Sequence, residues 1–220
     1  MAPRETCKEE TCVWATGIVV GRDDGELVSK PERLPLSMGT SGNKIVSLSC
    51  GREHVFLLSR DGHAFAMGGN SFGQLGCGHR QRVDSPLCVE SRLLTDDARV
   101  VQVACGGFHT CLLLDDGRVI SAGSGRHGQL GSGLERDHET FHRVCFEKER
   151  DERPFVYISC GDSHSAGIAG KRSDGNGAEE SPQQQQTVWV WGNGCQGRLG
   201  CDDEQDRKVS RPCRAQGGTN

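Results

Sequence analysis

The sequence lacks both the long apolar segments and the excess of basic charge that mark several classes of protein. Residues 1–11 alternate charge and polarity, so they do not resemble a signal peptide, and no run elsewhere approaches the length of a membrane span. The formal net charge is -4, from 26 basic and 30 acidic residues, which gives no cationic field to attract a phosphate backbone. We therefore expect an intracellular protein, cytoplasmic or nuclear, that does not bind nucleic acid.

No CxxC pair occurs among the 12 cysteines, and this absence argues against the two common structural uses of cysteine. Zinc sites usually bring their thiols in closely spaced pairs. Disulfide frameworks are typical of small secreted chains, which carry a secretory signal. We expect reduced thiols that pack as small apolar side chains, with no metal site and no cofactor.

Residues that favour helices do not dominate the composition. The 31 Gly, the 7 Pro and many Val-containing clusters favour short strands joined by tight turns. The predicted fold class is all-β.

Three segments, SCGREH, ACGGFH and SCGDSH, repeat at a fixed spacing. Their cysteines are 55 residues apart, since 105 − 50 and 160 − 105 both equal 55. A constant period of this length is typical of repeat architectures. The residues that share the register are Cys50, Gly51, His54, Cys105, Gly106, His109, Cys160, Gly161 and His164.

A glycine-rich element follows each of these segments: GGNSFGQLG from Gly68, GSGRHGQLG from Gly123 and GNGCQGRLG from Gly192. The first two are 55 residues apart and the third follows after 69, because about 14 residues are inserted within Lys171–Gln186. This insert contains four consecutive Gln and too few apolar residues to pack, so we expect a disordered surface loop. The expected turn glycines are Gly73, Gly76, Gly128, Gly131, Gly197 and Gly200.

An Asp-Gly pair lies between two apolar runs in two of the units, at residues 61–62 and 116–117. Such a pair predicts a hairpin with a type I′ turn. Phe65, Ile120, Trp189 and Trp14 fall in one register, which predicts a shared packing layer. A sheet as small as one unit cannot bury its apolar side chains alone, whereas radial stacking of such sheets into a propeller buries them.

The combination of CG-x-x-H, a DG hairpin and G-x-x-x-x-G-Q-L-G at this period resembles the regulator of chromosome condensation repeat, over residues 11–212. WD and kelch repeats have shorter periods and lack this motif set. The resemblance implies blades of four antiparallel strands with glycines in the tight turns. It also implies that His54, His109 and His164 are structural and hold a loop by bonding to the backbone.

We expect about three full blades and a partial one, because four VWG-like halves accompany only three CG-x-x-H halves. Members of the family usually close a ring of seven blades, so this ring is expected to be open and the chain to be a fragment or truncated product of a longer propeller. In the degenerate first unit, residues 22–25 read RDDG where the others have GQLG or GRLG. The expected units are a tail at 1–10, a partial blade at 11–43, repeats at 44–98, 99–153 and 154–212, with the insert at 171–186, and a tail at 213–220.

Residues 138–142, HETFH, match the zinc-protease pattern HExxH. That chemistry requires a helix, which places both histidines on one face. The repeat register instead places the motif in an extended outer segment, where we expect the two histidines to lie roughly 13 Å apart, at about 3.3 Å per residue, too far for one zinc. The mixed-charge run at residues 147–153, EKERDER, predicts a solvated loop.

No nucleophile, base and orienting residue converge on any motif, so we expect a non-enzymatic scaffold that binds other proteins. In the family such domains sit beside ubiquitin-ligase, kinase and trafficking modules, and a ubiquitin-pathway protein is one partner that the resemblance implies. The alternative is guanine-nucleotide exchange on a small Ran-like GTPase, which is the activity of the founding member of the family.

Overall fold

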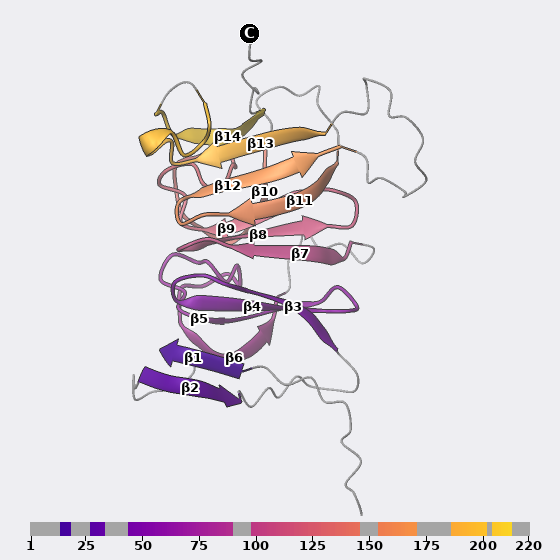
Figure 1. Cartoon of the computed structure of the whole chain (residues 1–220), viewed down its shortest axis with the longest axis vertical. Coiled ribbons are helices and arrows are strands. Elements are labelled where there is room, and N and C mark those ends of the chain that lie inside the picture. Colours follow the sequence, from indigo (N-terminus) through magenta and orange to yellow (C-terminus); the bar gives the residue numbers. More distant parts are fainter. Residues whose placement is uncertain are drawn as a thin grey trace, which may run out of the picture.

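Small antiparallel β-sheets stack face to face along the molecule in the computed structural model (Figure 1). The structure describes residues 14–18, 27–33, 44–89, 98–145, 154–170, 186–201 and 204–212. The expected tails, the RDDG segment, the EKERDER loop and residues 171–185 of the insert lie outside the described residues. Within the described ranges, no helix is long and apolar enough to cross a membrane.

Three sheets have four strands each, and in each sheet the strands follow one another in chain order. An additional strand pair, β1 and β2, precedes them in sequence. The predicted all-β class is confirmed. The strands are β1 (Trp14–Ile18) and β2 (Leu27–Arg33); β3 (Ile45–Cys50), β4 (His54–Ser59), β5 (Ala64–Gly68) and β6 (Val83–Cys88); β7 (Val100–Cys105), β8 (His109–Leu114), β9 (Val119–Gly123) and β10 (His138–Arg143); and β11 (Phe155–Cys160), β12 (His164–Ala169), β13 (Thr187–Gly192) and β14 (Arg207–Pro212).

The hairpins at the Asp-Gly pairs form as predicted, but the predicted turn type is wrong. A type I′ turn needs positive φ at both central residues, whereas among the described residues Gln196 is the only non-glycine with positive φ. The amide of Gly62 donates to the carbonyl of Ser59 (3.0 Å), and Gly62 itself has φ +85°. The arrangement is a three-residue loop that ends in a left-handed glycine, so aspartate does not have to adopt a strained backbone conformation.

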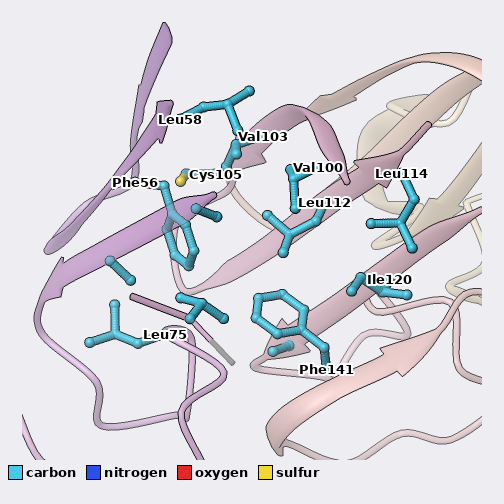
Figure 2. Packing of buried hydrophobic residues seen from close by; sticks show 14 residues of the cluster. Phe56, Leu58, Leu75, Val100, Val103, Cys105, Leu112, Leu114, Ile120 and Phe141 are labelled. Atoms are coloured by element: carbon cyan, nitrogen blue, oxygen red, sulfur yellow. The ribbon is translucent and has the colours of Figure 1, made fainter. Parts of the chain in front are cut away.

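Side chains from the middle sheet enter two separate cores. Leu112 and Leu114 of β8 point into the first, which lies between the first and second four-stranded sheets (Figure 2). Cys111 and Leu113 of the same strand point into the second, which also holds Trp191 of the last sheet. All six residues of β8 are buried, because neighbouring sheets cover both of its faces.

The two outer four-stranded sheets each expose apolar side chains on a face that no four-stranded sheet covers. Val46 and Leu48 of β3 are 52% and 53% exposed at one end of the stack, and Tyr157 of β11 is 53% exposed at the other. Along β12 buried and half-buried residues alternate, as expected for a strand with one covered face. The partial blade and the open ends show that the stack is an incomplete ring.

This arrangement predicts very different costs for two leucine truncations. Leu112→Ala leaves a cavity between two sheets and should lower the free energy of unfolding by about 2–5 kcal/mol. Leu48→Ala removes a side chain that is already half exposed and should change it by less than about 1 kcal/mol. Urea unfolding followed by circular dichroism measures both, and equal losses would contradict the described packing.

Candidate functional site

The three CG-x-x-H segments form equivalent turns at one end of the strands. In each turn the glycine amide donates to the carbonyl of the histidine, at 2.8–2.9 Å. The turns are also joined to one another: the Arg52 amide donates to the Gly107 carbonyl (3.2 Å), and the Gly107 amide donates to the Asp162 carbonyl (3.0 Å). A backbone ladder therefore links three successive sheets.

The side chains of His54 and His109 each connect their sheet to the next one through a hydroxyl group. Nε2 of His54 lies 2.9 Å from Oγ1 of Thr110, and that hydroxyl donates to the backbone carbonyl of Gln74 at 2.9 Å. His109 repeats the arrangement in the next sheet with Ser165 (2.8 Å), whose hydroxyl donates to the carbonyl of Gln129 (3.0 Å). We call each of these three-group connections a histidine bracket.

The brackets correct one expectation taken from the family resemblance. The Nε2 atoms of His54 and His109 bond to hydroxyl groups of the neighbouring sheet and not to the backbone. Within the described residues, Nδ1 of each ring has no hydrogen-bond partner. Because the single hydroxyl proton goes to a carbonyl, Nε2–H must be the donor toward the hydroxyl oxygen.

A histidine next to a hydroxyl superficially resembles a base and a nucleophile, but the bracket has the opposite polarity. The ring donates its proton, whereas a general base would accept the hydroxyl proton. His54 and Thr110 are also fully buried. Burial, and then the neighbouring His109, lower the pKa of His54 to about 4, which keeps its imidazole neutral near pH 7. These features describe a structural connection.

The glycine of each turn is required because the histidine ring packs directly on it. A Cβ added at Gly51, Gly106 or Gly161 would come within 2.1 Å of Cε1 of the following histidine. A side chain at this position would displace the ring and break the bracket.

The glycine-rich loops lie beside these turns and use their glycines in two ways. Gly73 and Gly128 have φ of +80° and +74°, and a Cβ on either would lie within 2.6 Å of a backbone atom of the next sheet. The Gln74 side chain accepts from the Phe72 amide (3.0 Å), and Gln129 accepts from the His127 amide (2.9 Å). The other expected turn glycines, Gly76, Gly131, Gly197 and Gly200, also have positive φ.

A stack of two phenylalanine rings, with one arginine guanidinium at each end, runs over the turns and loops of the first two four-stranded sheets. The Arg126 guanidinium lies 5.4 Å from the Phe72 ring centroid, the Phe72 and Phe108 centroids are 5.0 Å apart, and Arg52 lies 5.6 Å from the Phe108 centroid. Arg52 then forms a two-pronged ion pair with Asp162 of the third sheet, at 2.7 and 2.9 Å. We call these five residues the turn face.

Sequence reasoning missed the turn face because none of its residues repeats. Arg52, Phe108 and Asp162 occupy the variable positions of CG-x-x-H, and Phe72 and Arg126 occupy those of the glycine-rich element. One signal in the sequence could have revealed it. Large or charged residues stand at the non-repeating positions inside the repeated motifs, and the repeat brings all of these positions to the same end of the strands.

The HETFH segment forms the extended strand β10, as predicted, but the predicted separation of its histidines is wrong. The ring centroids of His138 and His142 are 4.0 Å apart, because the strand is irregular between them. Glu139 pairs with Arg80 (2.8 Å), and Nδ1 of His142 donates to the backbone carbonyl of Thr140 (2.9 Å). Burial and the adjacent His142 lower the pKa of His138 to about 4.

The repeated cysteines contribute contacts between sheets. The Cys105 thiol donates to the backbone carbonyl of Ser49 in the preceding sheet, at a sulfur–oxygen distance of 3.4 Å. The Cys160 thiol donates in the same way to the carbonyl of Ala104, also at 3.4 Å. Burial raises the pKa of Cys105 to about 12. Cys50, the first of the series, is exposed.

Comparison with protein families identifies the repeat. The family model described as "Regulator of chromosome condensation (RCC1) repeat" matches residues 61–113 and 116–168, and a second model with the same description matches residues 45–74 and 100–129.

The chain is similar to several kinds of larger protein. The chain is 29% identical over 175 residues to the mouse X-linked retinitis pigmentosa GTPase regulator, covering 80% of this chain and 16% of that protein. It is 29% identical to the Arabidopsis thaliana ultraviolet-B receptor UVR8 (94% and 42% covered) and 36% identical to the human probable E3 ubiquitin-protein ligase HERC3 (74% and 14%). The chain spans less than half the length of each of these relatives.

Solved structures show the same fold. Yeast RCC1 (Prp20), in a complex with Kap60, superposes with a TM-score of 0.68 at 19% identity, covering 93% of this chain and 44% of that one. Prp20p from Saccharomyces cerevisiae, in a study of its binding to Gsp1p and histones, gives 0.65 at 20% identity (84% and 40% covered). The predicted β-propeller, an incomplete ring of about three full blades and a partial one, is thereby confirmed.

The histidine bracket predicts a specific cost for removing one hydroxyl group. Thr110→Val keeps the shape of the side chain but leaves the buried Nε2–H of His54 and the Gln74 carbonyl unpaired, so the free energy of unfolding should fall by about 2–4 kcal/mol. Thr110→Ser keeps the hydroxyl that Ser165 provides in the next bracket, and it should cost about 1 kcal/mol. Chemical denaturation measures both, and a valine variant as stable as the serine variant would contradict the bracket.

Proposed function

Because this chain belongs to the regulator of chromosome condensation (RCC1) repeat family, we propose that it is a non-enzymatic scaffold that binds another protein through the turn face. The observation that carries the proposal is the stack of Arg52, Phe108, Phe72 and Arg126 across two blades. Arginine and aromatic side chains are enriched among the residues that dominate protein interfaces.

The charges of the turn face indicate the chemistry of the partner. Asp162 already neutralises Arg52, whereas no carboxylate in the described part of the chain pairs with Arg126. Arg126 is exposed and held over the Phe72 ring, so its guanidinium is positioned before binding and loses little side-chain freedom. A partner segment with a carboxylate for Arg126 and an apolar side chain for the half-buried phenylalanines would fit this surface.

The rigidity of the surface also supports a binding role. The backbone ladder and the two histidine brackets fix the turns that carry Arg52 and Phe108. A surface held in one conformation binds without the entropic cost of ordering mobile loops.

The names of the similar proteins are compatible with protein partners. They include a GTPase regulator, a ubiquitin-protein ligase and a protein studied for its binding to Gsp1p and histones. A GTPase or a ubiquitin-pathway protein are accordingly the partner classes to test first, with nucleotide exchange on a small GTPase as the alternative function.

A charge-reversal pair tests the scaffold. A protein that the full chain binds directly, measured with both components purified, should bind Arg126→Glu about tenfold more weakly, since the substitution removes the stacked cation and repels a carboxylate. Arg60→Glu makes the same change at an exposed hairpin at the opposite end of β4, and it should bind like the wild type. Equal binding by all three proteins would exclude the turn face as the binding surface.

A nucleotide-release assay with a panel of small GTPases distinguishes the scaffold from the alternative function, guanine-nucleotide exchange. The scaffold proposal expects no acceleration of release at stoichiometric concentrations of the chain. Acceleration for any GTPase would replace it with the exchange function.

A further inference from the structure

Four potential metal-binding atoms converge between the second and third four-stranded sheets. A ring nitrogen of His109 and the thiol sulfurs of Cys111 and Cys160 all lie within 4.8 Å of one another. The hydroxyl of Ser165 touches all three: it is 2.8 Å from Nε2, 3.8 Å from the Cys111 sulfur and 3.7 Å from the Cys160 sulfur. Cys111 and Cys160 lie 49 residues apart and come from neighbouring blades (160 − 111 = 49).

These separations are close enough for the four groups to surround one zinc ion after small side-chain shifts. Zinc bonds to sulfur at about 2.3 Å and to nitrogen or oxygen at about 2.0–2.2 Å, so ligands at tetrahedral angles lie roughly 3.3–3.8 Å from one another. The oxygen–sulfur distances of 3.7 and 3.8 Å match this spacing, and the shorter nitrogen–oxygen distance needs only a small outward shift. We infer that His109, Cys111 and Cys160 form a Zn²⁺ site, with the Ser165 hydroxyl as a weaker oxygen donor.

The charge balance suits the buried position. His109, Cys111 and Ser165 are no more than 1% exposed. Two thiolates neutralise one Zn²⁺, so the loaded site adds no net charge to the interior.

Loading moves protons in a defined way. The two thiols release one proton each to solvent as their sulfurs bond to zinc, and the imidazole proton moves from Nε2 to Nδ1, which has no hydrogen-bond partner within the described residues. The Ser165 hydroxyl keeps its bond to the Gln129 carbonyl and turns a lone pair toward the ion. Because His109 and Cys111 are buried and Cys160 is only partly exposed, we expect zinc to enter most readily while the chain folds.

The preceding contact between sheets serves as an internal control. His54, Cys105 and Thr110 occupy the equivalent positions there, but Phe56 stands where the second contact has Cys111 (111 − 55 = 56). Phe56 is fully buried and fills the place of the second sulfur. The contact between the first and second four-stranded sheets therefore has a histidine bracket but only one thiol. The inferred zinc site is specific to the contact between the second and third sheets.

The test measures zinc in the full chain after expression in zinc-supplemented medium and washing with a mild chelator. The wild type should retain about one zinc per chain by plasma mass spectrometry. Cys111→Ala and Cys160→Ala should each retain less than about a tenth of that. Cys105→Ala, at the equivalent position of the contact without a second thiol, should retain the wild-type amount.

Refolding the wild type with Co²⁺ gives a readout that does not depend on the stability of any variant. Thiolate-to-cobalt charge-transfer absorption with tetrahedral ligand-field bands is the expected spectrum. Two results would overturn the site. One is a wild-type chain that retains no zinc and shows no such absorption with Co²⁺, and the other is a Cys111→Ala variant that retains as much zinc as the wild type.

Discussion

The constraint on which this structure depends is that each small sheet has two apolar faces and no means of burying both by itself. β8 shows the constraint satisfied, because its side chains enter one core with Leu112 and the other with Leu113. β3 shows it unsatisfied, since Val46 and Leu48 remain half exposed where no full sheet covers them. Stability therefore comes from contacts between sheets, and residues at those contacts have the greatest effect.

Polar connections between sheets add orientation to this apolar packing. Each histidine bracket joins two sheets through three buried groups, and a partial set of these bonds would leave polar atoms unpaired in the interior. The same connections hold the turns that carry Arg52 and Phe108. The repeat thus uses its recurring residues to build a frame, and in the turns it leaves variable residues such as Arg52 on the surface. We expect function to reside in the variable residues.

The sequence predicted most of the fold because a fixed period constrains many residues at once. The period of 55 residues located the strands, the turns and the equivalence of His54, His109 and His164. The predictions were wrong where the local geometry depended on one extra residue in a loop or on the direction of one side chain. A hairpin loop longer by one residue changed the turn type, and the irregularity in β10 brought His138 and His142 together. The turn face was missed because its residues do not repeat, and the meeting of Cys111 and Cys160 was missed because only the stacking of blades brings them together.

Native-state hydrogen exchange tests most directly whether the sheets depend on their neighbours for stability. Amides of β8 and β9, with both faces covered, should exchange only through global unfolding, whereas amides of β3 should exchange through an opening of smaller free energy. That gradient from the middle sheet to the open end is what mutual support predicts. Equal protection of β3 and β8, or separate unfolding of the middle sheet before its neighbours, would contradict it.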